Sequence, residues 1–152
     1  MDPASRPCGP SADCNPKIKV IFEYWTRISP PGALPGRQHF DPLDLKALLP
    51  NLWIVDVVGD PPRFKYRIAG TKIVDYLGQE PTGKWMDEVF PHLEESYTFR
   101  DLMTTVREGR PQWRRGTPTL QIEKSFKVVE QLSLPLASDG KKVDMVLNLT
   151  VF

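Results

Sequence analysis

The distribution of proline constrains this chain more than any other feature of its sequence. Nine of the 16 prolines lie in residues 1–50, and the other seven are spread over residues 51–152. Proline fixes φ and lacks a backbone N–H, so it ends helices and interrupts strands. With 16 prolines and 10 glycines in 152 residues, the chain stays below the roughly 25–30% of Pro and Gly that marks low complexity. We therefore expect one folded domain behind a proline-punctuated first third.

That first third divides into a tail and a helical extension. Residues 1–15 are polar and contain three prolines, so we expect a disordered tail. Residues 16–50 form the predicted extension, whose first helix starts after Asn15 and ends near Ser29, before a Pro-Pro-Gly run. Its apolar side chains recur at helical spacing. This stripe consists of Ile18, Ile21, Phe22, Trp25 and Ile28.

A second, shorter helix is predicted between two prolines. Asp41-Pro42 is a favourable helix start, and the helix is expected to end before Pro50. It completes the extension.

Beyond residue 50 the apolar period changes to two, which predicts strands in residues 51–152. The expected elements are strands at 52–58 and 63–68, short helices at 71–77 and 84–89, a longer helix at 93–108, and strands at about 112–115, 125–136 and 143–152. Asp139-Gly140 is a strong turn signal between the last two strands. Pro135 falls inside a strand, which predicts a sheet edge or a bulge there.

Composition excludes several classes of protein. The 20 Lys and Arg residues nearly balance 19 Asp and Glu residues, so no strong field favours nucleic acid or an anionic membrane surface. No stretch approaches the ~18 apolar residues of a membrane span, and the first residues are not typical of a signal peptide. We therefore expect a cytoplasmic protein. Both cysteines, Cys8 and Cys14, lie in the tail, where a structural disulfide or metal site has little support.

An ordered set of short motifs runs through about residues 20–150. It comprises Leu48-Leu49-Pro50, Leu52 to Asp56, Phe64 to Thr71, Tyr76-Leu77-Gly78, Thr82-Gly83, Leu134-Pro135-Leu136, Asp139-Gly140 and Val143-Asp144-Met145. Together with the order of elements, these motifs resemble the PAS domain, in particular bacterial proteins made of a single PAS-like domain with an N-terminal helical extension. Residues 112–124 depart from the pattern, and the third strand is not aligned there.

The resemblance implies an α+β fold with a PAS-like five-stranded antiparallel sheet, helices on one face, and the N-terminal helical extension. It implies a sensory or regulatory domain that binds a small apolar or amphipathic ligand, or a signalling partner, in or around an apolar pocket. A change in conformation or dimerisation would then pass to a partner protein. The alternative is a dimerisation or interaction module with a filled core and no ligand. No cofactor is required by the residues.

Aromatic and aliphatic side chains between the expected sheet and helices are the candidate pocket lining. Tyr and Trp combine an apolar body with one polar group, which suits a ligand that must be oriented. Any such residue also serves as ordinary core. The candidates are Tyr66, Ile68, Ile73, Tyr76, Leu77, Trp85, Phe99, Met103, Leu134, Met145 and Leu147.

Two minor alternatives rest on polar residues. His92 precedes the longer helix and is the candidate axial ligand for a haem sensor, although a polar residue also fits the start of a helix. Trp113 lies within a basic group that could clamp a phosphate and stack on a base, although cations also favour a helix C-terminus. The group consists of Arg107, Arg110, Arg114 and Arg115.

The sequence offers little for catalysis. Two histidines, with no nucleophile elbow, metal-binding motif or phosphate loop, argue against an enzyme. The cysteines lie outside the predicted fold, which argues against a chromophore attached through cysteine.

The stripe of the first helix is the best candidate interaction surface. It must be covered, either by the domain's own sheet or by a second subunit. We expect a homodimer, because two-fold oligomers are common and the other sheet face also needs a cover. The predicted interface is Ile18, Ile21, Phe22, Trp25 and Ile28.

Overall fold

A computed structural model describes residues 9–116 and 128–152. In these ranges the strands form one antiparallel sheet of the order β2-β1-β5-β4-β3, which confirms the predicted fold class. The strands are β1 (Leu52–Val58), β2 (Arg63–Ala69), β3 (Gln112–Gly116), β4 (Val129–Leu136) and β5 (Met145–Val151). The α-helices are α1 (Pro16–Ile28), α2 (Thr71–Leu77), α3 (Met86–Val89) and α4 (Tyr97–Glu108), and the 3₁₀ helices are η2 (Arg37–His39), η3 (Pro42–Asn51) and η4 (Leu93–Glu95).

Some of the predicted elements include residues that the structure does not describe. The first half of the predicted tail with Cys8, the start of the predicted strand 125–136, and most of the unaligned stretch 112–124 lie outside the described residues. Within the described part, Gln112 to Gly116 form an edge strand paired with β4.

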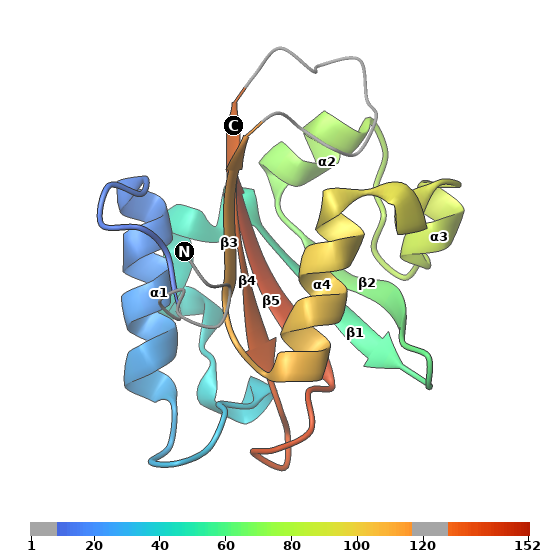
Figure 1. Cartoon of the computed structure of the whole chain (residues 1–152). Helices are drawn as coiled ribbons and strands as arrows, with labels where there is room; N and C mark the ends of the chain where they lie inside the picture. Colours follow the sequence, from blue (N-terminus) through green and yellow to red (C-terminus); the bar gives the residue numbers. More distant parts are fainter. Residues whose placement is uncertain (1–8, 117–127) are drawn as a thin grey trace, which may run out of the picture.

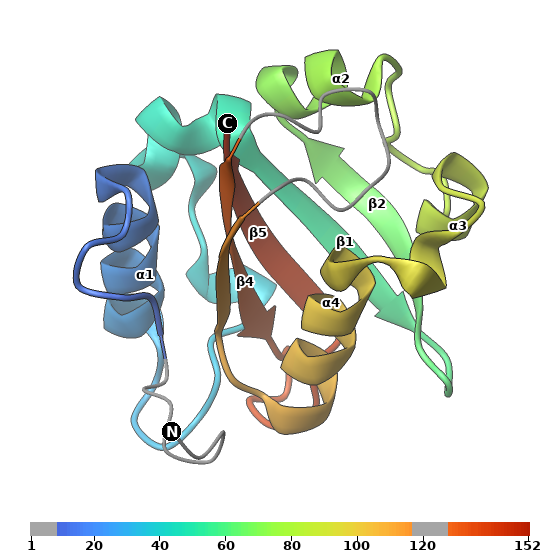
Figure 2. The ribbon, with the colours of Figure 1, turned by 45° about the horizontal axis from the view of Figure 1, so that its top comes forward.

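Helices cover both faces of the sheet, with α1 on one side and α4 on the other (Figures 1 and 2). We call the first the α1 face, where the side chains of α1 and η3 pack on Leu132, Leu134, Leu147 and Leu149. The second is the α4 face, where Trp53, Val55, Tyr66 and Val146 pack against α2, α3 and α4. The chain therefore has two cores separated by the sheet.

Helix α1 forms where expected and packs on the chain's own sheet. The Asn15 side chain caps it by accepting a hydrogen bond from the Lys17 amide at 2.9 Å. The side chains of Ile18 and Ile21 are 0% exposed, and the Trp25 indole N–H donates to the Pro135 carbonyl at 2.9 Å. The extension is therefore an integral layer of the fold.

Two helix boundaries differ from the predictions. The second helix is a 3₁₀ helix that kinks at Leu45 and continues through Pro50 instead of ending before it. The predicted helix 93–108 is divided at Ser96, whose side chain accepts a hydrogen bond from the Phe99 amide at 3.1 Å and so caps α4. A serine that caps a new helix competes with continuation of the preceding one.

A bulge in β2 changes which face its last residues occupy. Val55 is paired with Tyr66, whereas the neighbouring Ile54 is paired with Ile68, so Arg67 is an extra residue in β2. Tyr66 therefore packs on the α4 face and Ile68 on the α1 face.

Pro135 lies in an inner strand at a point where one neighbour has ended. The pairing of β3 with β4 extends only to Ser133, so β3 does not reach Pro135. The missing N–H of Pro135 therefore costs no hydrogen bond to β3.

Candidate functional site

The structure divides the predicted pocket residues between the two faces of the sheet. Five of them pack in the core of the α4 face, namely Tyr66, Ile73, Leu77, Phe99 and Met103. Tyr76, on α2, is half-buried and its ring contacts that of Phe152, with centroids 4.7 Å apart. The first five residues therefore belong to the region between the sheet and helices α2 and α4.

Four predicted pocket residues are on the wrong face for that pocket. Ile68, Leu134, Met145 and Leu147 belong to the core of the α1 face. Ile68 is turned there by the bulge, and the other three occupy the alternate positions of β4 and β5 that face α1. Alternation fixes which residues share a face but not which face the helices cover.

Trp85 lies outside the core of the α4 face. Its ring is stacked by the Arg63 guanidinium, whose carbon is 4.1 Å from the ring centroid, and Lys65 is also close. Arg63 is held in turn by Asp87, with Nε and Oδ2 2.7 Å apart. This hydrogen bond is the main reason that the pKa of Asp87 lies below its ordinary value. Trp85 therefore helps to fasten α3 to β2.

A buried row of polar side chains, missed from the sequence, lies on the α4 face of β4 and β5. We call it the polar strip: Gln131, Ser133, Asn148 and Thr150, each at most 7% exposed. Gln131 is paired directly with Thr150, and Ser133 with Asn148. The signal in the sequence is the alternation Gln-Leu-Ser-Leu and Leu-Asn-Leu-Thr, which by itself predicts polar residues facing solvent.

Hydrogen bonds link the polar strip to the aromatic half of the same face. Ser133 donates to Asn148 Oδ1 at 2.7 Å, and Thr150 donates to Gln131 Oε1 at 3.2 Å. The Trp53 indole N–H donates to Thr150 Oγ1 at 2.9 Å. Trp53 in turn contacts the Tyr66 ring, with centroids 5.9 Å apart. Polar and aromatic residues are therefore parts of one connected surface.

Two buried polar atoms at the Thr150 end of the polar strip have no hydrogen-bond partner among the described residues. They are Nε2 of Gln131 and Oδ1 of Asn51, in side chains that are 5% and 2% exposed. Asn51 uses only its amide nitrogen, which donates to the Thr150 carbonyl at 3.0 Å. Burial of an unpaired donor or acceptor is uncommon in folded proteins.

An ion pair lies beside the polar strip, because Arg114 is the cross-strand neighbour of Gln131. Arg114 of β3 pairs with Asp101 of α4, with Nε and Oδ2 3.0 Å apart, and both side chains are about four-fifths buried. Burial raises the pKa of Asp101, and the hydrogen bond and charge of Arg114 act in the opposite direction. This pair fastens α4 to the edge strand and leaves no uncompensated charge between them.

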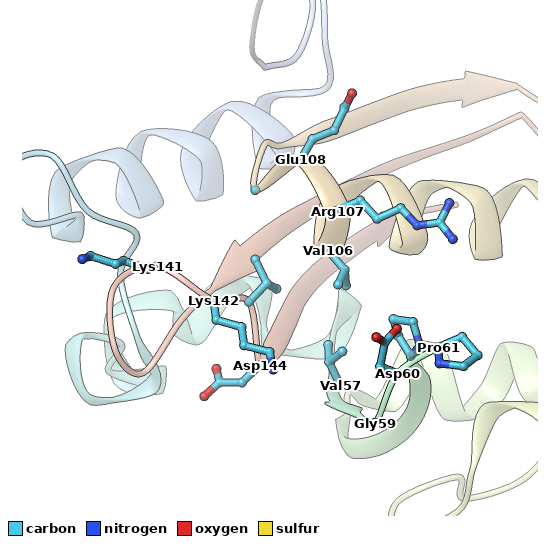
Figure 3. A pocket seen from close by; sticks show the side chains of 13 residues that line it. Val57, Gly59, Asp60, Pro61, Val106, Arg107, Glu108, Lys141, Lys142 and Asp144 are labelled. Atoms are coloured by element: carbon cyan, nitrogen blue, oxygen red, sulfur yellow. The ribbon is translucent and has the colours of Figure 1, made fainter.

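A separate groove of about 770 Å³ lies at the other end of α4 (Figure 3). The β1–β2 turn, the end of α4 and the loop before β5 form it, with Val57, Val106 and Val143 as apolar lining. Its charged lining residues carry both signs: Arg107, Lys141 and Lys142 against Asp60, Glu108 and Asp144. The groove includes none of the predicted pocket residues and favours neither sign of ligand charge.

The remaining candidates are dispersed. His92 is exposed and precedes η4 instead of α4, so it does not face the core. Arg115 points to the α1 side, where it pairs with Asp13 and Glu130, whereas Arg114 pairs with Asp101. The predicted basic group therefore does not converge on one anion.

Residues 9–116 and 128–152 bear on two classes of function. They contain no group of three or more His, Cys, Asp or Glu residues that could hold a metal ion. In the same ranges, no helix has the length and apolar character needed to cross a membrane.

The predicted interface residues of α1 mostly contact their own chain. Ile18 and Ile21 are fully covered, and Phe22, Trp25 and Ile28 pack in part against the same core. Tyr24, which the predicted stripe omitted, is 3% exposed and donates to Asp44 Oδ2 at 3.0 Å.

Comparison with known proteins bears on the family of the chain. A family model described as PAS domain matches residues 15–150. This range includes α1, strands β1 to β4 and most of β5. No curated protein matches the chain.

Proposed function

The chain belongs to the PAS domain family, whose members typically have sensory or regulatory roles, and we propose that it binds a small ligand on the α4 face. The ligand would lie between the sheet and helices α2 and α4. Binding would change the packing of these helices and so alter contacts with a partner protein. We place this activity in the cytoplasm and assign no catalytic step to the chain.

The composition of the α4 face carries this proposal. Small-molecule sites are mostly apolar and aromatic, with a few polar groups that set orientation. The α4 face has this composition, because Trp53 and Tyr66 adjoin the polar strip. Phe99 and Met103 of α4 are only partly buried, so they are placed to adjust to an occupant.

The short helices provide a means of transmission. Helices α2 and α3 have seven and four residues, and helices of this length depend on tertiary packing for their stability. A ligand that binds one packing of these helices better than another shifts the population towards it. The surface formed by α2, α3 and α4 is therefore the proposed output surface.

Native mass spectrometry of the purified full chain tests ligand binding. We expect additional non-covalent mass, and visible absorption would distinguish haem or flavin from a colourless ligand. Met103→Trp places a larger ring on the α4 face and should abolish the additional mass. Leu43→Trp is the matched control, because Leu43 is 76% exposed and belongs to neither core. A folded protein with no additional mass would contradict the proposal.

A ligand-free interaction module is the second candidate, and the filled part of the core favours it. Phe64, Met86 and Leu102 on the α4 face are at most 1% exposed. Under this alternative, substitutions on the outer surface of α2 to α4 impair partner binding, while the native mass equals that of the chain alone.

We also propose self-association through the outer face of α1. The inner stripe is covered by the sheet, but Val20 is 51% exposed beside Lys19 and Glu23. Sedimentation analysis should show a dimer that Val20→Glu weakens. A monomer at all concentrations tested would refute this part of the proposal.

A further inference from the structure

The α4 face of the sheet has an apolar, aromatic half and a polar half. On β1 and β2 it presents Trp53, Val55, Phe64 and Tyr66, whereas on β4 and β5 it presents the polar strip. Asn51 is the last residue of η3 and directly precedes β1, whose Leu52 is paired with Leu149 near the C-terminal end of β5. Its side chain bonds to Thr150 there.

The hydrogen bonds of the polar strip are complete at one end and incomplete at the other. Ser133 donates to Asn148 Oδ1, and the Asn148 amide nitrogen donates to the Val146 carbonyl at 3.2 Å. Around Thr150, by contrast, Gln131 keeps an unused amide donor and Asn51 an unused carbonyl acceptor. Both side chains are more than nine-tenths buried. One is bonded to the hydroxyl of Thr150 and the other to its carbonyl.

Burial without a partner removes the hydration of a polar group and returns nothing. Gln131 is used on one side only, where its Oε1 accepts from the Thr150 hydroxyl, while its Nε2 stays unpaired. A bound molecule that supplies the missing acceptor and donor would remove the cost in the occupied state only.

We propose that the Thr150 end of the polar strip, with Gln131 and Asn51, binds the amide or lactam group of a small neutral ligand. Such a group has a carbonyl oxygen to accept from Gln131 Nε2 and an N–H to donate to Asn51 Oδ1. Trp53 and Tyr66 supply an aromatic surface for the apolar body of the ligand. This inference rests on the proposed ligand-binding function and specifies its chemistry.

Charge on the α4 side favours a neutral ligand over a carboxylate. Arg114 of β3 is paired across the sheet with Gln131, and its guanidinium is already bonded to Asp101 and near Thr98. An anionic ligand would enter the buried strip without a counter-charge, at a large desolvation cost. A purely apolar ligand would leave the two polar atoms unpaired.

Nuclear magnetic resonance with three probes tests the assignment on the full chain. Benzamide presents a neutral amide on an apolar ring, benzoate replaces the amide by a charge, and toluene removes the polar group. We expect benzamide to shift the side-chain amide signal of Gln131 and the indole signal of Trp53. Benzoate and toluene should bind at least tenfold more weakly.

Substitution separates the role of Gln131 from general effects on the fold. Gln131→Leu should weaken benzamide binding at least tenfold, and its urea midpoint shows that the variant is folded, because the substitution removes the unpaired Nε2 but also removes the acceptor of the Thr150 hydroxyl. Gln38→Leu is the matched control, because Gln38 is exposed and donates to Ser138 in a loop. It should leave binding unchanged.

The outcomes distinguish this inference from the proposed function. Equal binding of benzamide and toluene, or equal binding to the wild-type and Gln131→Leu proteins, would overturn the amide site while leaving ligand binding by the α4 face in place. Absence of benzamide binding to the folded wild-type protein would also overturn it. The native mass of the purified protein then decides separately whether the α4 face holds another ligand.

Discussion

Replacement of Ile21 by alanine tests whether α1 is a layer of its own domain. Ile21 is 0% exposed and lies in the core of the α1 face. Removing three carbons from a buried Ile usually costs about 2–5 kcal/mol, through lost burial and the cavity left behind. With a denaturant slope of about 2 kcal/mol per molar urea, a loss of about 3 kcal/mol lowers the urea midpoint by about 1.5 M.

Leu43→Ala is the control, because Leu43 is 76% exposed, belongs to neither core and lies on η3, away from the proposed dimer surface of α1. The control should change the free energy of unfolding by no more than about 0.5 kcal/mol.

Unfolding should be followed by tryptophan fluorescence and circular dichroism at two protein concentrations tenfold apart. If α1 packs within its own chain, the midpoint shift of Ile21→Ala is the same at both concentrations. A helix docked on a second subunit would instead make stability depend on concentration, by about 1.4 kcal/mol per tenfold change. A concentration-dependent shift, or equal effects of the two substitutions, would refute the intramolecular arrangement.

Two further predictions concern other contacts of the fold. Gly70→Ala should strongly destabilise the protein, because the added Cβ would overlap the main-chain carbonyl of Leu49. Gly116→Ala is the control and should be tolerated, because a Cβ at position 116 meets open space. Equal urea midpoints for the two variants would be incompatible with this packing. Asp87→Asn should lower stability at pH 7, because Asp87 is paired there with Arg63 and its pKa is lowered in the folded protein. The stabilisation from this pair is complete above the ordinary pKa of the carboxyl, and it is lost as the pH falls through the lowered pKa. Urea midpoints of the wild-type and Asp87→Asn proteins should therefore converge as the pH falls below about 4, and a constant difference would contradict this origin of the stability.

Local sequence signals predicted the elements whose boundaries depend on local chemistry. Asn15 with Pro16 marked the start of α1, and the aspartate and glycine at 139 and 140 marked the turn before β5. These signals act through hydrogen bonds and backbone preferences within a few residues. The split at Ser96 was missed, because serine is compatible both with a helix interior and with a helix cap.

The candidate site was only partly predictable. Tyr66 and Phe99 were assigned to the correct side of the sheet, but Ile68 was not, because the extra residue in β2 is invisible to simple alternation. The residues of the polar strip, above all Gln131, were missed for a related reason. Alternation with leucine predicts a polar residue on an exposed face, and nothing local indicates that this face is buried in the tertiary structure.

By itself, the sequence determined the order of strands and helices along the chain and the apolar stripe of α1. It also determined which residues of the regular strands β4 and β5 share a face. These follow from periodicity and from the fixed backbone preferences of proline and glycine. Only the tertiary structure decided which face each helix covers, and therefore that Leu134 packs in the core of the α1 face while Gln131 is buried on the opposite face. That choice depends on contacts between residues far apart in the chain, such as Trp25 with Pro135 and Arg114 with Asp101.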